Sequence, residues 1–239
     1  EIDPVWEAGN KNIPGIYIEF KEPWLNPKGF EQIVYDVLAN TQDMNIIEKP
    51  EPEDTPFYIN NGTINVGNTN GKVILQTFSL ESLVRVAEVF QGKVPMCFLL
   101  WKGTGATDLT YDDPLGYASF INLGVKYKAH FIGPCIAGAP NDYPELDQPW
   151  QDYLIHRAKM KNHPYTFDTY DQMAKYFGQY NFGVADGMFN PPYLDALFTN
   201  HSDMSINYMI THGWRKSPAS QTLVDAREVL RKLGYLDNN

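Results

Sequence analysis

The amino-acid sequence predicts an α/β fold built around a parallel sheet. Short apolar runs typical of strands alternate along the chain with longer stretches in which apolar residues recur at helical spacing. The runs are almost continuously apolar, as is typical of strands covered on both faces. Six such strand–helix units follow one another. A succession of this kind either closes into a (β/α)8 barrel or opens into a doubly wound sheet.

Each unit begins with a predicted strand. The six strands cover residues 15–20, 72–78, 95–101, 130–136, 163–167 and 184–189. Helical spacing is clearest over residues 30–38, 80–87 and 150–158, and Ser79 is the predicted N-cap of the second of these helices. No Gly-x-Gly-x-x-Gly motif follows the first strand. This disfavours the dinucleotide-binding form of the doubly wound sheet and favours the barrel.

We expect a single domain, residues 1–239. Residues 49–70 are rich in Pro, Glu, Asn and Gly and are predicted to form a surface insertion, and residues 217–236 are predicted to form a C-terminal amphipathic helix. A closed barrel of this type has eight strands. The six predicted strands are therefore expected to be strands 3–8, and an N-terminal segment or a partner chain is expected to supply the first two strand–helix units.

The composition limits the classes of partner that the protein is expected to bind. The formal net charge of −10 disfavours nucleic-acid binding, although a small phosphate ligand remains compatible with it. No apolar run is long enough to predict a membrane span. The Asn61 and Asn200 triplets fit the N-glycosylation pattern and favour a secreted protein. Cys97 and Cys135 are expected on neighbouring strands, as free buried thiols or as a disulfide.

Two charged residues stand at the end of the first predicted strand. Glu19 and Lys21 are two apart and so share a face of the strand. One interpretation is an ordinary ion pair at a strand end. The other is a ligand site, in which the carboxylate holds a hard divalent cation and the ammonium faces a phosphate.

Four segments in order resemble the periplasmic type of the glycerophosphodiester phosphodiesterase family. The first is Gly-Ile-Tyr-Ile-Glu-Phe-Lys-Glu-Pro-Trp, where the family has Gly-Ile-Tyr-Pro-Glu-Ile-Lys-x-Pro-Trp. The second is Leu-Gln-Thr-Phe with the following helix, and the third is His-Pro-Tyr-Thr-Phe. The fourth is Gly-Val-Ala-Asp-Gly-Met-Phe, which has one inserted Ala relative to the family's Gly-Val-Asp-Gly-Leu-Phe. These segments begin at Gly15, Leu75, His163 and Gly183.

The resemblance implies a (β/α)8 barrel that hydrolyses glycerophosphodiesters to an alcohol and glycerol 3-phosphate. It implies that Glu19 binds a divalent metal, Ca²⁺ or Mg²⁺, that Lys21 binds the phosphate, and that Tyr165 packs on the glycerol. The other candidates for the pocket lining are Gln76, Phe78, Trp101 and Phe167.

The chain also departs from the family pattern. The family's His-Arg, Glu-x-Asp and His-Asp motifs, which carry the catalytic histidines and the other metal carboxylates, are not found in it, and the letters His156-Arg157 fall in a predicted helix. Asn190-Pro191-Pro192 also departs from the family's last strand. The sequence thus predicts a phosphodiesterase portion that is inactive without its N-terminal part. The alternative is a non-catalytic structural, storage or matrix protein on the same barrel. An open α/β domain with another activity is disfavoured by the four ordered segments.

Overall fold

The computed structural model describes residues 16–22, 25–40, 58–59, 63–64, 73–92, 94–141, 144–179, 194–213, 231 and 234–235. The chain divides into two compact units, residues 1–201 and residues 202–239. The first unit contains the sheet and the pocket. In the second, the structure describes mainly helix α7 (Ser202–Thr211). No helix among the described residues is both long enough and apolar enough to cross a membrane.

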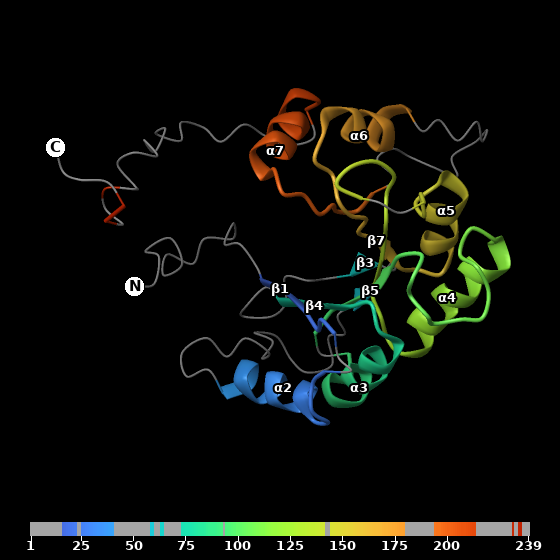
Figure 1. Ribbon diagram of the computed structural model, residues 1–239, viewed down its shortest axis with the longest axis vertical. Helices are drawn as coiled ribbons and strands as arrows, with labels where there is room; N and C mark the ends of the chain where they lie inside the picture. Colours follow the sequence, from blue (N-terminus) through green and yellow to red (C-terminus); the bar gives the residue numbers. More distant parts are fainter. Residues whose placement is uncertain are drawn as a thin grey trace. The chain divides into compact units, whose positions relative to one another are not determined.

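The main element of the first unit is a five-stranded parallel sheet (Figure 1). Its strand order, β1-β4-β5-β6-β7, follows the sequence without reversal, and every neighbouring pair is parallel. The strands are β1 (Ile16–Glu19), β4 (Val73–Thr77), β5 (Met96–Leu100), β6 (Phe131–Pro134) and β7 (Lys161–Asn162). A separate antiparallel pair, β2 (Tyr58–Ile59) and β3 (Thr63–Ile64), lies within the predicted insertion.

A helix follows each strand of the large sheet. These helices are α2 (Phe30–Asn40), α3 (Leu80–Phe90), α4 (Pro114–Lys126), α5 (Pro149–Arg157), and α6 (Tyr170–Ala174) with the continuing π-helix η1 (Lys175–Gln179). Caps that satisfy free backbone N–H groups stand at the starts of α3, α4, α5 and α6. The Ser79 hydroxyl accepts a hydrogen bond from Ser82 N at 3.3 Å, which confirms the predicted cap, and Asp113 Oδ1 accepts one from Leu115 N at 2.9 Å.

The two faces of the sheet pack against different partners. Residues such as Leu75, Phe98 and Ile132 join the main hydrophobic core with the apolar sides of the helices, where the Phe98 ring stacks on Phe120 at 4.2 Å. The strand side chains that point to the other face of the sheet form a second cluster, which includes Cys97 and Leu99. The cluster also contains residues that follow directly after the strands. Helices α2 to α5 therefore lie on one side of the sheet, as Figure 1 also shows.

The predicted α/β fold with a parallel sheet is confirmed in the described residues. The strand predicted at residues 163–167 differs in extent, because β7 begins earlier, at Lys161, and regular pairing is interrupted at Pro164, which has no N–H to donate. Bonding to β6 nevertheless continues, since Tyr165 N donates to Pro134 O at 3.0 Å. The predicted strand at residues 184–189 and nearly all of the predicted helix at residues 217–236 lie outside the described residues.

Gly116, in the first turn of α4, provides a test of the packing. A Cβ at this position would overlap the backbone carbonyl oxygen of Thr110, and a backbone atom cannot move aside as a flexible side chain can. We expect Gly116→Ala to destabilise the protein by about 1–3 kcal/mol, measured by urea denaturation. The matched control is Gly105→Ala, because a Cβ there meets open space. Equal stabilities of the two variants would contradict the described packing of this turn.

Candidate functional site

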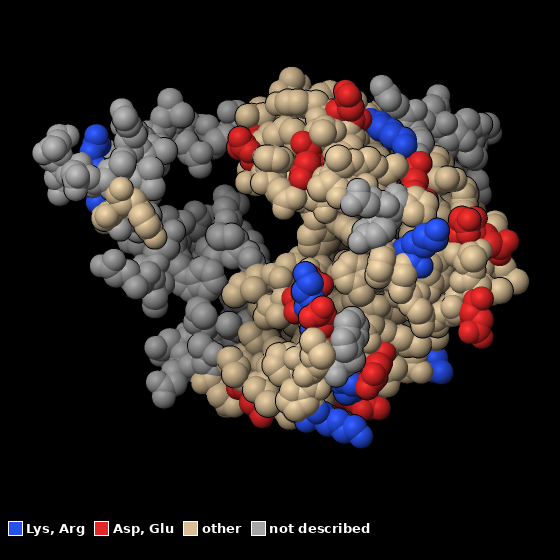
Figure 2. Space-filling model, viewed as in Figure 1, with Lys and Arg blue, Asp and Glu red and all other residues tan. Residues whose placement is uncertain are grey.

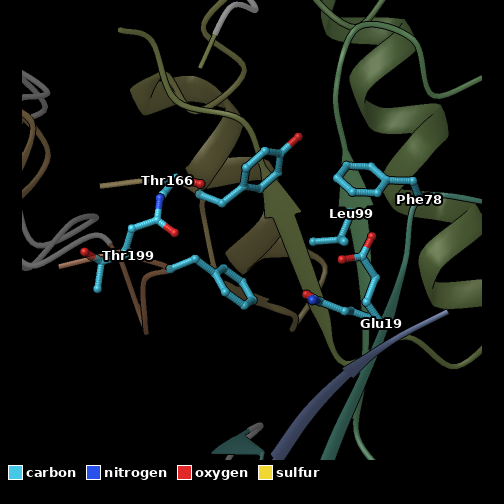
Figure 3. A pocket seen from close by; sticks show the side chains of 9 residues that line it. Glu19, Phe78, Leu99, Thr166 and Thr199 are labelled. Carbon is cyan, nitrogen blue, oxygen red and sulfur yellow. The ribbon is translucent and has the colours of Figure 1, made fainter. Parts of the chain in front are cut away.

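A pocket of about 260 Å³ opens in the first unit, at the end of the sheet where the strands finish (Figure 3). Glu19 is the last residue of β1 and Gln76 lies near the end of β4, so both stand at this rim. The described residues that line the pocket are Glu19, Gln76, Phe78, Leu99, Tyr165, Thr166, Phe198, Thr199 and Asn200. Strand termini at the carboxyl end of a parallel sheet are the usual place for a binding site.

One corner of the pocket consists of oxygen acceptors. The parallel register of β1 and β4 sets Glu19 directly beside Gln76. Glu19 is half-buried, and the ion pairs among the described residues do not include it. The side-chain oxygen Oε1 of Gln76 is buried without a hydrogen-bond partner in the described structure. A carboxylate and an unpaired amide oxygen in one corner favour a ligand that is positively charged or donates hydrogen bonds.

Aromatic rings form another part of the wall. Phe78 and Tyr165 meet edge to face, with ring centroids 5.7 Å apart. The Tyr165 hydroxyl donates a hydrogen bond to Leu100 O at 3.0 Å, and the Phe198 ring packs on Tyr17 at 4.8 Å. Because these rings are fixed by neighbours outside the pocket, the aromatic wall is formed before any ligand enters.

The segment 194–200 closes the pocket on the β7 side. Its backbone bonds to the extension of β7: Phe198 N donates to Pro164 O at 3.0 Å, and Phe167 N donates to Phe198 O at 2.8 Å. At its end, the Asn200 side-chain amide donates to Asp168 Oδ2 at 2.8 Å. Sequence patterns did not predict this segment as part of the site, because it lacks the apolar run that marks the other strands. Asn200 was expected only as a glycosylation site.

A layer of largely buried side chains packs against the residues that line the pocket. The Tyr17 hydroxyl lies 3.1 Å from His163 Nδ1, and the His163 ring stacks on Phe131 at 4.0 Å. Burial lowers the pKa of His163 to about 4 and raises the pKa of the Cys97 thiol to about 12. Neither group is therefore ready to exchange a proton near neutral pH.

The structure brings four of the predicted site residues together and places the others elsewhere. Glu19, Gln76, Phe78 and Tyr165 all line the pocket. Lys21 is exposed and is not among the described lining residues. Trp101 meets Phe78 edge to face at 6.5 Å without lining the pocket.

Three other predictions concern residues away from this pocket. Phe167 is fully buried and packs against Tyr176 and Phe177, with ring centroids 5.3 and 6.2 Å away, so it does not line the pocket. Cys97 and Cys135 are free buried thiols. Asn61 lies outside the described residues.

A second hollow, of about 480 Å³, lies among residues 102–112, after β5, with Pro144 and Leu146 as its other lining residues. Its lining is mostly threonine, glycine and aspartate from a single loop. The Tyr111 hydroxyl is held by the backbone of the same loop, through a hydrogen bond to Thr104 O. This second hollow is lined by none of the residues that the sequence motifs predicted for the site.

A polar network is buried between α5 and β7, outside the pocket. Asn162 is fully buried, and its Nδ2 donates to Asp147 Oδ1 and to Asp152 Oδ1, both at 2.8 Å. Burial raises the pKa of Asp147 well above its usual value, and the nearby charge of Asp152 raises it further. His156 extends the network to the surface, with Nε2 2.8 Å from Asp195 Oδ2 and Nδ1 3.2 Å from Asp152 Oδ2. His156 lies in helix α5, as the sequence predicted, and its contacts with Asp152 and Asp195 make it part of this network.

From the contacts of His156 with Asp152 and Asp195 we predict that the stability of the protein depends on pH. Burial alone would lower the pKa of His156, but the hydrogen bonds and charges of Asp152 and Asp195 outweigh it and raise the pKa to about 10. Because this exceeds the value of about 6.5 in an unfolded chain, the stabilisation is complete below about pH 6.5 and is lost as the pH rises toward 10. We therefore expect His156→Asn to destabilise the protein at pH 6 and to have little effect at pH 10, measured by urea midpoints. An effect that does not change with pH would contradict this.

Comparisons with known proteins do not identify the chain. No protein-family model matches it, and a search of curated proteins finds no significant match. Among the described residues, no group of three or more His, Cys, Asp or Glu is arranged to hold a metal ion. Glu19 supplies the sole carboxylate among the described lining residues, whereas a hard divalent cation takes six or more oxygen ligands.

Proposed function

We propose that this chain is a portion of a metal-dependent glycerophosphodiester phosphodiesterase built on a (β/α)8 barrel. Two features support the barrel. The strand order follows the sequence without the reversal that marks a doubly wound sheet, and helices α2 to α5 lie on one face of the sheet. The opposite face carries its own cluster of strand side chains, as the interior of a barrel does. The strands that complete the barrel would come from outside the described residues.

The single observation that best supports the proposed activity is the convergence of Glu19, Gln76, Phe78 and Tyr165 on one rim pocket. These residues come from three of the four segments that resemble the family. Glu19 and Gln76 fit a Ca²⁺ or Mg²⁺ site as oxygen donors, and the remaining ligands would come from outside the described residues. When bound, the metal would polarise the phosphoryl oxygens. Lys21, exposed just beyond β1, is the proposed phosphate contact, and Tyr165 is the proposed contact with the glycerol.

The proposal is tested by measuring choline release from glycerophosphocholine with added Ca²⁺ or Mg²⁺. The chain alone is expected to show none, because no histidine is among the described residues that line the pocket. The chain together with the strands that complete the barrel is expected to show metal-dependent release. Turnover by the chain alone would overturn our placement of the acid–base groups. A completed barrel that binds no metal and releases no choline would overturn the enzyme proposal.

The second candidate is a non-catalytic protein on the same barrel, with a structural, storage or extracellular role. One observation favours it: Glu19 is the sole charged residue among the described pocket lining, whereas phosphate recognition calls for a cation. Either role is compatible with the proposed secretion and with glycosylation at Asn61, whereas a glycan on Asn200 Nδ2 would stand at the pocket, where this nitrogen donates to Asp168 Oδ2. On the face shown in Figure 2, acidic and basic side chains are interleaved, which gives no support for a nucleic-acid partner.

A further inference from the structure

We propose that the rim pocket binds an organic ammonium cation, such as the trimethylammonium group of a choline-like molecule. This inference does not rest on the proposed hydrolysis, since it requires neither a metal nor the strands that complete the barrel. It begins from the charge of the pocket: Glu19 is the sole charged residue among the described lining residues, and no described cation forms an ion pair with it. A half-buried carboxylate without a counter-ion attracts a positively charged ligand.

The described lining beside Glu19 suits an organic cation by itself, whereas a divalent metal there would need further ligands from outside the described residues. Figure 3 shows the Glu19 carboxylate extending toward Phe78 and Leu99 rather than toward Thr166 and Thr199. Phe78 and Tyr165 supply two rings on this wall, with centroids 5.7 Å apart, and Phe198 supplies a third to the same pocket. Aromatic faces attract cations, and quaternary ammonium groups are commonly recognised by several rings together with a carboxylate. Aromatic carbon cannot take the place of the oxygen ligands that Ca²⁺ and Mg²⁺ need.

The remaining polar atoms and the size of the pocket define the ligand further. The buried, unpartnered Gln76 Oε1 lies next to Glu19 in the sheet register and can accept a hydrogen bond from a ligand hydroxyl. A volume of about 260 Å³ is below that of pockets for drug-sized ligands, so it suits a head group or a small amino alcohol. Choline has both features, a trimethylammonium group and a hydroxyl.

The test is calorimetric titration of the chain as it stands, in a buffer containing a chelator and at constant ionic strength. The two probes are choline and its uncharged isostere 3,3-dimethyl-1-butanol. We expect choline to bind at least about tenfold more tightly, because the two ligands differ mainly in charge. We expect Glu19→Gln to remove most of this preference and Phe78→Leu to weaken choline binding several-fold. The matched control is Glu22→Gln, an exposed carboxylate three residues away, which is expected to leave binding unchanged.

Three results would overturn the proposal. Equal affinity for choline and the isostere would identify a merely apolar pocket. Choline binding that is unaffected by Glu19→Gln would place the ligand elsewhere. Binding of Ca²⁺ without binding of choline, in a titration without chelator, would identify an inorganic cation site. Failure of the completed barrel to hydrolyse a phosphodiester would bear only on the proposed enzyme activity, because the titration has no catalytic readout.

Discussion

Replacing Asn162 by alanine is expected to cost about 2–5 kcal/mol of folding free energy at pH 7. Asn162 Nδ2 bridges two buried carboxylates, Asp147 and Asp152, with hydrogen bonds of 2.8 Å to each. Both aspartates are 2% exposed, so water cannot take the place of the lost amide. Burial raises the pKa of each aspartate, and the charge of Asp152 raises the pKa of Asp147 further. Removing the donor between them therefore leaves two buried carboxyl groups without the hydrogen bonds that stabilise their charged forms.

Urea denaturation at two pH values measures this effect and its cause. Because the pKa of Asp147 is raised in the folded state, this group costs increasing folding free energy as the pH rises above the usual pKa of aspartate, and the hydrogen bond from Asn162 offsets part of that cost. The loss caused by Asn162→Ala should therefore be smaller at pH 4 than at pH 7. Adding Asp147→Asn to the variant should recover at least about 1 kcal/mol at pH 7 by removing one of the carboxylates. The control, Asn122→Ala on the exposed side of α4, should change stability by less than about 0.5 kcal/mol. Additive effects of Asn162→Ala and Asp147→Asn would contradict the bridge.

The central sheet could be predicted from the sequence because strands that are covered on both faces consist mainly of apolar residues. The run Met96–Leu100 is buried at every position, and it is apolar at every position for the same reason. Ser79 could be predicted as a cap because its hydroxyl acts locally, three residues from its partner. The extended segment 194–200 could not be predicted, since it has no apolar run and is held by backbone and side-chain hydrogen bonds to residues 156–168, which are distant in the sequence.

The site could be predicted only in part, for a similar reason. Glu19 and Gln76 were identified from separate motifs, and the register of two parallel strands then brings them together. Phe198 and Thr199 reach the pocket from more than a hundred residues away in sequence, so neither spacing nor periodicity could relate them to Glu19. Phe167 illustrates the reverse case, because it lies two residues after Tyr165 in the same motif but is buried against Tyr176 and Phe177 of η1.

In the completed barrel, Glu19→Ala is expected to lower metal-dependent hydrolysis of glycerophosphocholine by at least about a thousandfold. This expectation rests on the proposed function, in which Glu19 is a metal ligand that a methyl group cannot replace. Glu19→Gln should be nearly as inactive, because a neutral amide oxygen binds a hard cation more weakly than a carboxylate does. Glu19 is half-buried at the end of β1, so neither substitution empties the core, and urea midpoints should stay close to the wild-type value.

Two measurements separate loss of the metal from loss of the fold. Calorimetric titration with Ca²⁺ should show weaker metal binding in both Glu19 variants, while the matched variant Glu22→Gln should keep both metal affinity and activity, because that carboxylate is exposed and lies beyond the strand. Retained hydrolysis in Glu19→Ala would remove Glu19 from the metal site. If Glu19→Ala lost activity but kept its full affinity for Ca²⁺, the carboxylate would be acting on the substrate instead, which is the role that binding of an ammonium group would give it.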